Sequence, residues 1–325
     1  MMWYFEIAIV GLLALVVYVL QMYLRLIINI FLEVSVKAPP EELEDLPGEH
    51  LTLRTKDGQH LSAVLVSATR NPARGTIVFL HEYGSDLRSA AKYAPFLPQA
   101  GFNLFAFDFR GHGGSTCPAD FVPRQWITDR EILDLDAAIN YLHRRGLTPV
   151  GLLGISRGGV AAAIKAAQDF RVAAVVTDGA FSTAGTVLEY ILKWVAIFAV
   201  IRVIYRNLPI WFYRSLAYLA VWTSEVRLRL RFPSLEKALR RRKAALFMVH
   251  GLEDTYIDYR QANFLYALAA EPKELWLVPQ ARHNESATIR PEEYAERVTE
   301  FFAREFVGAA RASKASTPRG ERNEG

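Results

Sequence analysis

The residues PVGLLGISRGGVAAAIKAA, positions 149–167, carry the clearest structural signal in this chain. They open with a short apolar run that predicts a buried strand, and they continue after a turn into an alanine-rich helical pattern. The turn, GISRG at 154–158, has the spacing Gly-x-Ser-x-Gly at a strand-to-helix junction, which is typical of a strained turn that exposes a nucleophilic serine. Residues as small as Gly154 and Gly158 let strand and helix pass closely, and the amides that open the helix favour negative charge beside Ser156. Taken alone, the motif fits a small-residue turn with a serine N-cap equally well.

The composition is that of a globular chain without a strong charge bias. The 325 residues are 51% hydrophobic, which is enough for one large core or two modest ones. Lys and Arg number 38 and Asp and Glu 34, so the net charge of +4 does not indicate a nucleic-acid partner. The single cysteine, Cys117, excludes an internal disulfide and a zinc site built on several cysteines. We therefore expect no metal, no cofactor and no nucleic acid.

An apolar segment occupies residues 3–32, with IAIVGLLALVVYVL uninterrupted over 7–20. About 20 apolar residues suffice to cross a bilayer, and the segment lacks the polar face of a soluble helix. It also lacks the basic start and the small-residue cleavage site of a cleaved signal peptide. We predict a single-pass transmembrane anchor over residues 1–35.

A short linker is expected over residues 36–50, where two prolines and an acidic run follow the anchor. Glu6 is the only charged residue before the uninterrupted apolar run at 7–20, whereas Arg25 and Lys37 follow this run. Basic residues tend to stay on the cytoplasmic side of a membrane, so the domain after the anchor is expected in the cytoplasm.

Strand and helix patterns alternate on both sides of a long insertion. Strands are expected in a hairpin over 51–68, then at 75–80, 102–107, 150–155, 172–176, 244–249 and 274–278, and helices at 89–98, 128–145, 157–167, 258–270 and 291–306. Such alternation predicts an α/β fold, a mainly parallel sheet with helices on both faces. We assign residues 51–181 and 240–307 to this core, and the small and charged residues 308–325 to a disordered tail.

The insertion, residues 182–239, is apolar, aromatic and basic. It lies between two strands of one sheet, so it cannot cross a membrane once. A hairpin that turns at 207–209 would place Glu189, Lys193 and Arg202 in lipid at about 3 kcal/mol each. A helical cap at the bilayer interface, with its basic groups toward headgroups, is favoured over a lid that contacts only protein.

A nucleophilic serine needs a base, and the base needs an acid that orients it. Of the seven histidines, His283 fits best, because its loop follows the last strand and therefore reaches the sheet edge that carries Ser156. The acid is expected after the preceding strand, where Asp254 has the better spacing. Its rivals are Glu253, Asp258 and Asp178.

Together these motifs resemble the α/β-hydrolase superfamily, whose triad follows the chain order Ser, acid, His. GISRG at 154–158 resembles the nucleophile turn of that family, and DFRGHG at 108–113 is similar to its D-x-R-G-x-G turn. HGLED at 250–254 resembles the H-G-x-x-D acid loop, and His283 matches the final histidine. The resemblance covers residues 51–306, with the cap inserted where the family usually carries one.

The resemblance also implies an oxyanion hole built from the backbone amides of Arg157 and Tyr83. The sequence departs from the family pattern at Glu82, where the family usually has glycine. A carboxylate that points inward would oppose a developing oxyanion, whereas one that faces solvent or pairs with an arginine would not.

These features indicate a membrane-anchored serine hydrolase, similar to esterases and lipases, that cleaves esters or thioesters through an acyl-enzyme. Ser156 would attack, His283 would act as base and then as acid, and Asp254 would hold the histidine tautomer. An apolar cap beside an anchor favours hydrophobic or lipid-like acyl substrates. The alternatives are a catalytically inactive domain that binds lipid or a protein partner, which Glu82 favours, and a basic cap whose main role is binding headgroups.

Overall fold

The computed structural model describes residues 2–32, 43–198 and 207–316. The chain divides into two compact units, Met1–Val36 with Thr183–Phe232, and Lys37–Ser182 with Pro233–Gly325. The parts of the predicted linker, cap and tail at 36–42, 199–206 and 317–325 lie outside the described residues.

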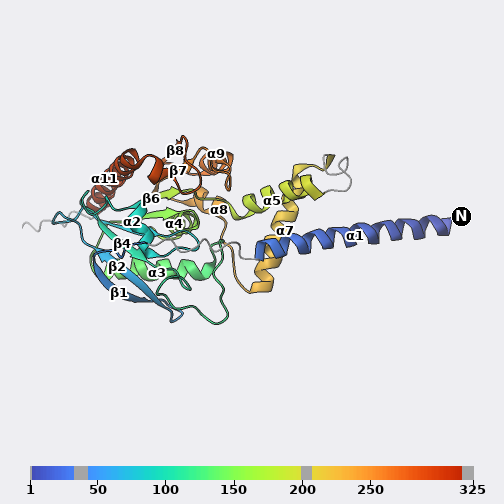
Figure 1. The fold of residues 1–325 in the computed structure, drawn as a ribbon, viewed down its shortest axis with the longest axis horizontal. Helices are drawn as coiled ribbons and strands as arrows, with labels where there is room; N and C mark the ends of the chain where they lie inside the picture. The colour runs from blue at the N-terminus through green and yellow to red at the C-terminus, as the bar shows by residue number, and fades with distance from the viewer. Residues whose placement is uncertain (1, 33–42, 199–206, 317–325) are drawn as a thin grey trace, which may run out of the picture. The chain divides into compact units, whose positions relative to one another are not determined.

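The larger unit is built on an 8-stranded sheet in the order β1-β2-β4-β3-β5-β6-β7-β8 (Figure 1). The strands are β1 Glu49–Arg54, β2 His60–Val66, β3 Thr76–Leu80, β4 Asn103–Phe107, β5 Val150–Ile155, β6 Val172–Asp178, β7 Ala245–Gly251 and β8 Lys273–Val278. The β1–β2 and β2–β4 pairs are antiparallel and all others are parallel, which confirms the predicted hairpin and the mainly parallel sheet. Strands β3, β4 and β5 are buried along their whole length, because helices cover both faces.

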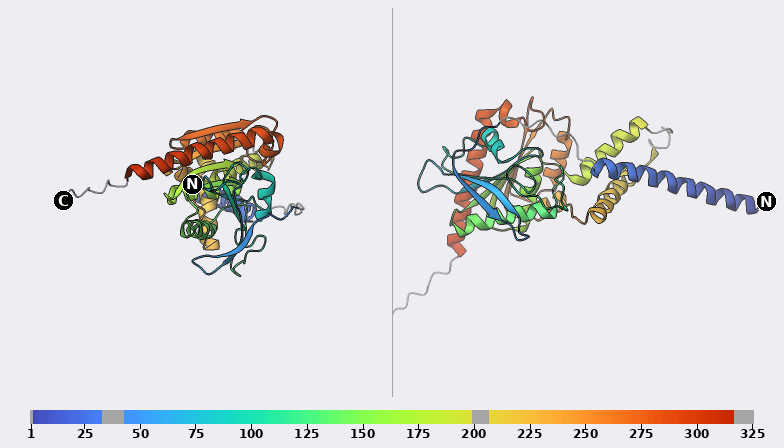
Figure 2. Two further views of the ribbon diagram at one scale, coloured as in Figure 1. Left: turned by 90° about the vertical axis from the view of Figure 1, so that its left-hand side faces the viewer. Right: turned by 60° about the horizontal axis from the view of Figure 1, so that its bottom comes forward.

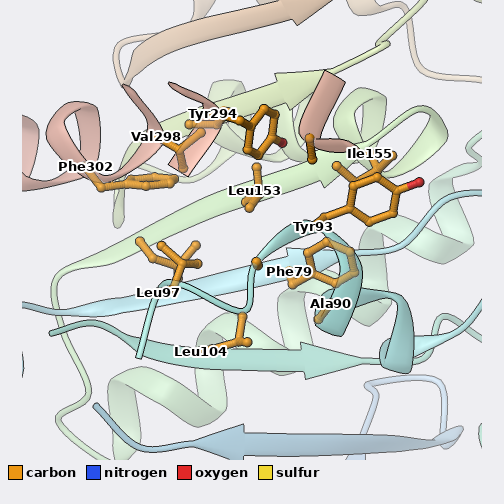
Figure 3. Packing of buried hydrophobic residues seen from close by; sticks show 14 of the residues in the cluster. Phe79, Ala90, Tyr93, Leu97, Leu104, Leu153, Ile155, Tyr294, Val298 and Phe302 are labelled. Atoms are coloured by element: carbon orange, nitrogen blue, oxygen red, sulfur yellow. The ribbon is translucent and has the colours of Figure 1, made fainter. Parts of the chain in front are cut away.

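The helices of this unit form a layer on each face of the sheet (Figure 2). They are α2 Ala90–Tyr93, α3 Asp129–Arg144, α4 Arg157–Gln168, α8 Leu235–Arg241, α9 Tyr259–Leu268, α10 Ser286–Ile289 and α11 Pro291–Ser316, with a 3-10 turn η1 at Leu87–Ser89. On one face, Phe79 and Leu153 pack among Tyr93, Val298 and Phe302 of α2 and α11 (Figure 3). Several aromatic rings are buried in this core, and truncating one such ring typically destabilises a protein by about 3–5 kcal/mol.

The described part of the smaller unit contains three helices, α1 Met2–Leu32, α5 Thr183–Phe198 and α7 Ile210–Leu228. Helix α1 packs against α7 through its C-terminal third, where Ile28 and Phe31 are buried and the Phe31 ring meets Phe232 edge-on at 5.0 Å. The side chains of residues 3–19 are exposed. The apolar stretch Trp3–Asn29 is long enough to cross a membrane by length and composition.

Two predicted boundaries are wrong. The predicted cap at 182–239 includes α8, but α8 belongs to the larger unit, where Leu235 and Leu239 are buried and the helix packs on α4. The predicted tail at 308–325 begins too early, since α11 continues to Ser316. Alanines are frequent between 308 and 316, and alanine has the highest helix propensity.

The segment at 89–98 was expected to be one helix, and it is a short 3-10 turn followed by a single helical turn. Its apolar residues nonetheless face the core, where Tyr93 and Leu97 are buried. Packing therefore places these side chains without a regular helix.

Candidate active site

Strand β5 ends at the sharp turn that carries Ser156. The serine has φ 52° and ψ −117°, a conformation that a residue with a Cβ atom adopts only under strain. A Cβ atom on Gly154 would overlap the carbonyl of Gly158, and one on Gly158 would overlap the carbonyl of Leu80. Both glycines are therefore required for strand and helix to approach this closely. The turn is further held by the Ser156 amide, which donates to the Asp178 carbonyl at 2.7 Å.

Three loops at the carboxyl ends of β5, β7 and β8 bring the predicted serine, acid and histidine together. The Ser156 Oγ lies 3.0 Å from the His283 Nε2, and the His283 Nδ1 lies 2.6 Å from the Asp254 Oδ2. The other carboxylate oxygen of Asp254 accepts from the amides of Tyr256 and Ile257, both at 2.8 Å. With its proton on Nδ1, His283 donates to Asp254 and leaves Nε2 free to accept from the serine hydroxyl.

The Asp254 carboxylate is fully buried but stabilised in its charged form. Burial acts to raise its pKa, and the hydrogen bond and charge of His283 together with the Ile257 amide outweigh burial, so the pKa lies below its ordinary value. The nearby His250 is kept neutral because burial lowers its pKa, and its Nε2 donates to the Ile257 carbonyl at 2.8 Å. The Nε2 of His250 also lies 3.5 Å from the Asp254 Oδ2, so His283, at 2.6 Å, is the nearer of the two imidazoles.

The three rival acids occupy other positions. Glu253 is exposed beside Asp254, and Asp258 caps α9 by accepting from the Arg260 amide at 2.9 Å. Asp178 is buried behind the site, and its carboxylate accepts a hydrogen bond from the Ser286 hydroxyl. The geometry favours Asp254 among the acids that the sequence left open.

The residues expected to supply the oxyanion amides lie next to the serine turn. Arg157 is the first residue of α4, so its amide has no intrahelical acceptor, and Tyr83 lies in the loop that follows β3. The Arg157 side chain turns away, pairs with buried Glu131 and lies over the rings of Tyr83 and Phe109 at 5.8 and 5.3 Å. Burial lowers the pKa of Arg157 to about 9, so it remains a cation at neutral pH. The assignment of the two amides stays a prediction.

The side chain of Glu82, the departure from the family pattern, faces η1 and α2. One carboxylate oxygen accepts from the Ser89 hydroxyl at 3.1 Å, and the other lies 3.5 Å from the Tyr93 hydroxyl. The Tyr93 hydroxyl also lies 3.4 Å from the carbonyl of Asn284, the neighbour of His283. Sequence reasoning did not anticipate these hydroxyl donors.

Sequence reasoning also missed a buried contact behind the histidine loop. The Ser286 hydroxyl donates to the Asp178 Oδ1 at 2.9 Å, and both side chains are fully buried. Burial raises the pKa of Asp178 to about 7. The sequence holds two hints of this contact: Ser286 follows His283 by three residues, and Asp178 ends a strand.

The DFRGHG turn at 108–113, after β4, makes structural contacts that hold neighbouring segments together. Its Asp108 accepts from the amides of Leu87 at 2.6 Å and Gly114 at 2.8 Å. Its Arg110 is fully buried and pairs with Asp134 of α3 at 2.7 Å. Removing one partner of such a buried pair typically destabilises a protein by about 3–5 kcal/mol. Across the part of the chain that the structure describes, no three Cys, His, Asp or Glu side chains are grouped to hold a metal ion.

Comparison with known proteins agrees with this architecture. The model of the alpha/beta hydrolase family matches residues 77–297. The uncharacterized protein YfhR of Salmonella typhi is 27% identical over 252 residues, which cover 72% of this chain and 74% of YfhR. YfhR of Escherichia coli K12 is 25% identical over 266 residues, which cover 78% of this chain and 80% of YfhR.

Solved structures show the same fold. The Pyrococcus furiosus esterase Pf2001 superposes with a TM-score of 0.62 at 24% identity, over 84% of this chain and 98% of the esterase. The esterase domain of a Rhodothermus marinus protein superposes with a TM-score of 0.53 at 20% identity, over 78% of this chain and 99% of that domain. With the family model matched across most of the sheet and through all three loops of the site, the chain belongs to the α/β-hydrolase family.

Proposed function

We propose that this α/β hydrolase is a membrane-anchored serine hydrolase that cleaves carboxylic esters or thioesters through an acyl-enzyme. The observation that carries the proposal is the continuous hydrogen-bonded chain from Ser156 through His283 to Asp254, with contacts of 3.0 and 2.6 Å. This arrangement couples a nucleophile to a base and the base to a buried carboxylate, which is how a serine hydroxyl is activated at neutral pH.

The first half of the reaction forms the acyl-enzyme. The Ser156 Oγ attacks the carbonyl carbon as its proton moves to the His283 Nε2, and the Asp254 carboxylate stabilises the imidazolium. The amides of Arg157 and Tyr83 are the proposed donors to the oxyanion, and losing one such donor typically lowers the rate about 100- to 1,000-fold. The tetrahedral intermediate collapses when the bond to the leaving group breaks and His283 protonates the departing alcohol or thiol.

In the second half, water takes the place of the leaving group. His283 accepts a proton from water as the water oxygen attacks the acyl carbon, and it returns this proton to the Ser156 Oγ as the acid product departs. No metal or redox partner enters this sequence, and each proton is accounted for by His283.

The membrane part of the proposal depends on α1. Its apolar stretch Trp3–Asn29 is 27 residues long, about 40 Å of helix, which exceeds the roughly 30 Å hydrocarbon core of a bilayer. A catalytic domain tethered in this way would meet hydrophobic or lipid-like acyl substrates at the membrane. The charges around the apolar run at 7–20, Glu6 before it and Arg25 and Lys37 after it, favour a cytoplasmic location for the catalytic domain.

A second candidate is an inactive hydrolase-fold domain that binds lipid or a protein partner at the membrane. Its support was the carboxylate of Glu82. Because both oxygens of this carboxylate face the hydroxyls of Ser89 and Tyr93, the side chain already has partners in η1 and α2, and this support weakens. A third candidate, headgroup binding by the basic cap, predicts salt-sensitive vesicle binding that does not depend on Ser156.

Labelling with a fluorophosphonate probe tests the proposal, using the full chain in detergent. We expect labelling of the wild type, none of Ser156→Ala, and much slower labelling of His283→Ala. Glu253→Gln, which changes an exposed carboxylate beside Asp254, is the matched control and should label like the wild type. A folded wild type that takes up no probe would contradict the hydrolase proposal. Positive labelling would be followed by ester and thioester substrates of increasing acyl length.

A further inference from the structure

Helix α7 presents two opposite faces. Its buried side chains are Tyr213, Ala217, Ala220 and Ser224. The large apolar side chains that point away are Trp211, Tyr218, Leu219, Trp222 and Val226, which we call the α7 outer face. At about 100° per residue these two sets fall on opposite sides of the helix, so the outer face is a continuous stripe rather than scattered exposure.

The α7 outer face is unusually apolar for a surface in contact with water. Trp211 is 64% exposed and Trp222 58% exposed. A tryptophan or tyrosine presents about 150–250 Å² when uncovered, so the three aromatic residues at roughly half exposure, with Leu219 and Val226 beside them, leave a patch of several hundred Å². Patches of this size on soluble proteins usually mark an interaction site.

The position of α1 indicates what covers the patch. Helices α1 and α7 belong to the same compact unit, and α7 crosses α1 near the C-terminal end of α1 (Figures 1 and 2). Among the described side chains of α1, the buried ones, Ile28 and Phe31, lie at this end. With α1 as a membrane span, this end of α1 lies at the membrane surface, where a helix with one apolar face is stabilised in the plane of the interface.

The charges around the stripe fit the same environment. Arg214, Arg227 and Arg229 are exposed on or just after α7. The acidic residue of this helix, Glu225, is engaged within the unit and accepts from the Phe232 amide at 2.8 Å. Tryptophan and tyrosine prefer the interfacial zone of a bilayer, and arginine beside them reaches anionic headgroups.

We propose that the α7 outer face docks on the surface of the bilayer that α1 spans, with its aromatic rings in the interfacial zone and its arginines toward anionic headgroups. The inference rests on the proposed role of α1 as an anchor. It adds a second, peripheral contact that holds the small unit flat on the membrane. A lipid surface accounts for both the aromatic stripe and the basic residues beside it.

The test places one fluorophore at a time on the full chain, reconstituted in phosphatidylcholine vesicles with or without phosphatidylglycerol. The native cysteine is first removed by Cys117→Ser. A label at Leu13→Cys then reports on the span, a label at Trp222→Cys reports on the α7 outer face, and a label at Phe170→Cys serves as the control. Phe170 is a matched control because it is an aromatic residue 92% exposed in the larger unit. Lipids that carry a nitroxide should quench the labels at 13 and 222 and leave the label at 170 unquenched.

The outcomes separate this inference from the anchor. Quenching at 13 but not at 222 would overturn the docking face and leave the anchor in place, whereas quenching at neither site would overturn the anchor as well. Energy transfer between copies labelled at 222 that persists on dilution into excess lipid would show that a second copy covers the face, which also overturns the proposal.

The basic residues give an independent readout. Each arginine near an anionic surface contributes enough attraction to change a docking constant about fivefold. We therefore expect Arg214→Gln to lower quenching at 222 in vesicles that contain phosphatidylglycerol and to reduce its dependence on salt. Arg240 is an exposed arginine of α8 in the larger unit, so Arg240→Gln should leave the quenching at 222 and its salt dependence unchanged. Equal effects of the two substitutions would contradict the placement of headgroups beside α7.

Discussion

Replacing Asp178 by asparagine should make the protein more stable, and increasingly so as pH rises. Burial raises the pKa of Asp178 from an ordinary value of 3.8 to about 7. Between these values the unfolded chain has released a proton that the folded chain still holds, so the folded state loses stability as pH increases. A shift of about three pKa units means that ionising Asp178 destabilises the folded state by about 4 kcal/mol. This destabilisation is fully present above pH 7 and absent below about pH 4.

Asparagine keeps the shape of the side chain and an oxygen that accepts from Ser286, but it carries no proton to lose. The free energy of unfolding of Asp178→Asn, relative to the wild type, should therefore increase by about 2–3 kcal/mol between pH 5 and pH 8. For a chain of this size that corresponds to a relative gain of about 5 °C in Tm.

Thermal unfolding of the full chain in detergent, followed at several pH values, measures this difference. Glu253→Gln serves as the control for removing an exposed carboxylate. The reasoning is refuted if the difference in Tm between Asp178→Asn and the wild type is the same at pH 5 and pH 8. A variant that is less stable at every pH by a constant amount would show that a lost contact, and not a buried charge, dominates.

Three further substitutions test the site. Gly158→Ala should destabilise the protein by about 3 kcal/mol or more, because the new methyl group meets the carbonyl of Leu80; native-like Tm and labelling would contradict the strained turn. Asp254→Asn should lower kcat about 1,000- to 10,000-fold with little change in KM, because His283 loses the acceptor that sets its tautomer; kinetics on the best ester substrate measure this. Glu82→Gln should change kcat less than about threefold, since its oxygens face hydroxyl donors; a tenfold rise in kcat would instead show that the charge opposes the oxyanion.

The parts of the structure that the sequence predicts are those with a strong local cause. The turn at Ser156 is such a case, because its backbone requires glycine at 154 and 158 whatever surrounds it. The β1–β2 hairpin likewise turns at Gly58, where φ is 86° and glycine is favoured. Ser156, Asp254 and His283 each follow the end of a parallel strand. Because parallel strands end at one edge of the sheet, the sequence already predicts that the three residues lie close together.

The parts that it does not predict depend on packing between distant segments. Asp178 and Ser286 are 108 residues apart, and nothing local to either residue indicates the other. Glu82 is similar, because its donors come from η1 and α2, whose positions depend on how this short segment packs on the sheet. The membership of α8 in the larger unit follows from the burial of Leu235 against that core, which a continuous apolar pattern through the insertion conceals.

The buried acid behind the histidine loop has a consequence for catalysis as well as for stability. A charged Asp178 and a protonated His283 attract each other, so ionised Asp178 favours the imidazolium that forms during the reaction. Above pH 7 the same charge that destabilises the fold would assist the step in which His283 takes the serine proton. Asp178→Asn should therefore lower kcat about two- to tenfold at pH 8 and leave it unchanged at pH 5, where the wild-type carboxyl is still protonated. If the ratio of the wild-type kcat to that of Asp178→Asn does not vary with pH, Asp178 positions the loop through Ser286 alone. If this ratio grows with pH, the charge assists catalysis, which would explain why a destabilising charge is kept beside the site.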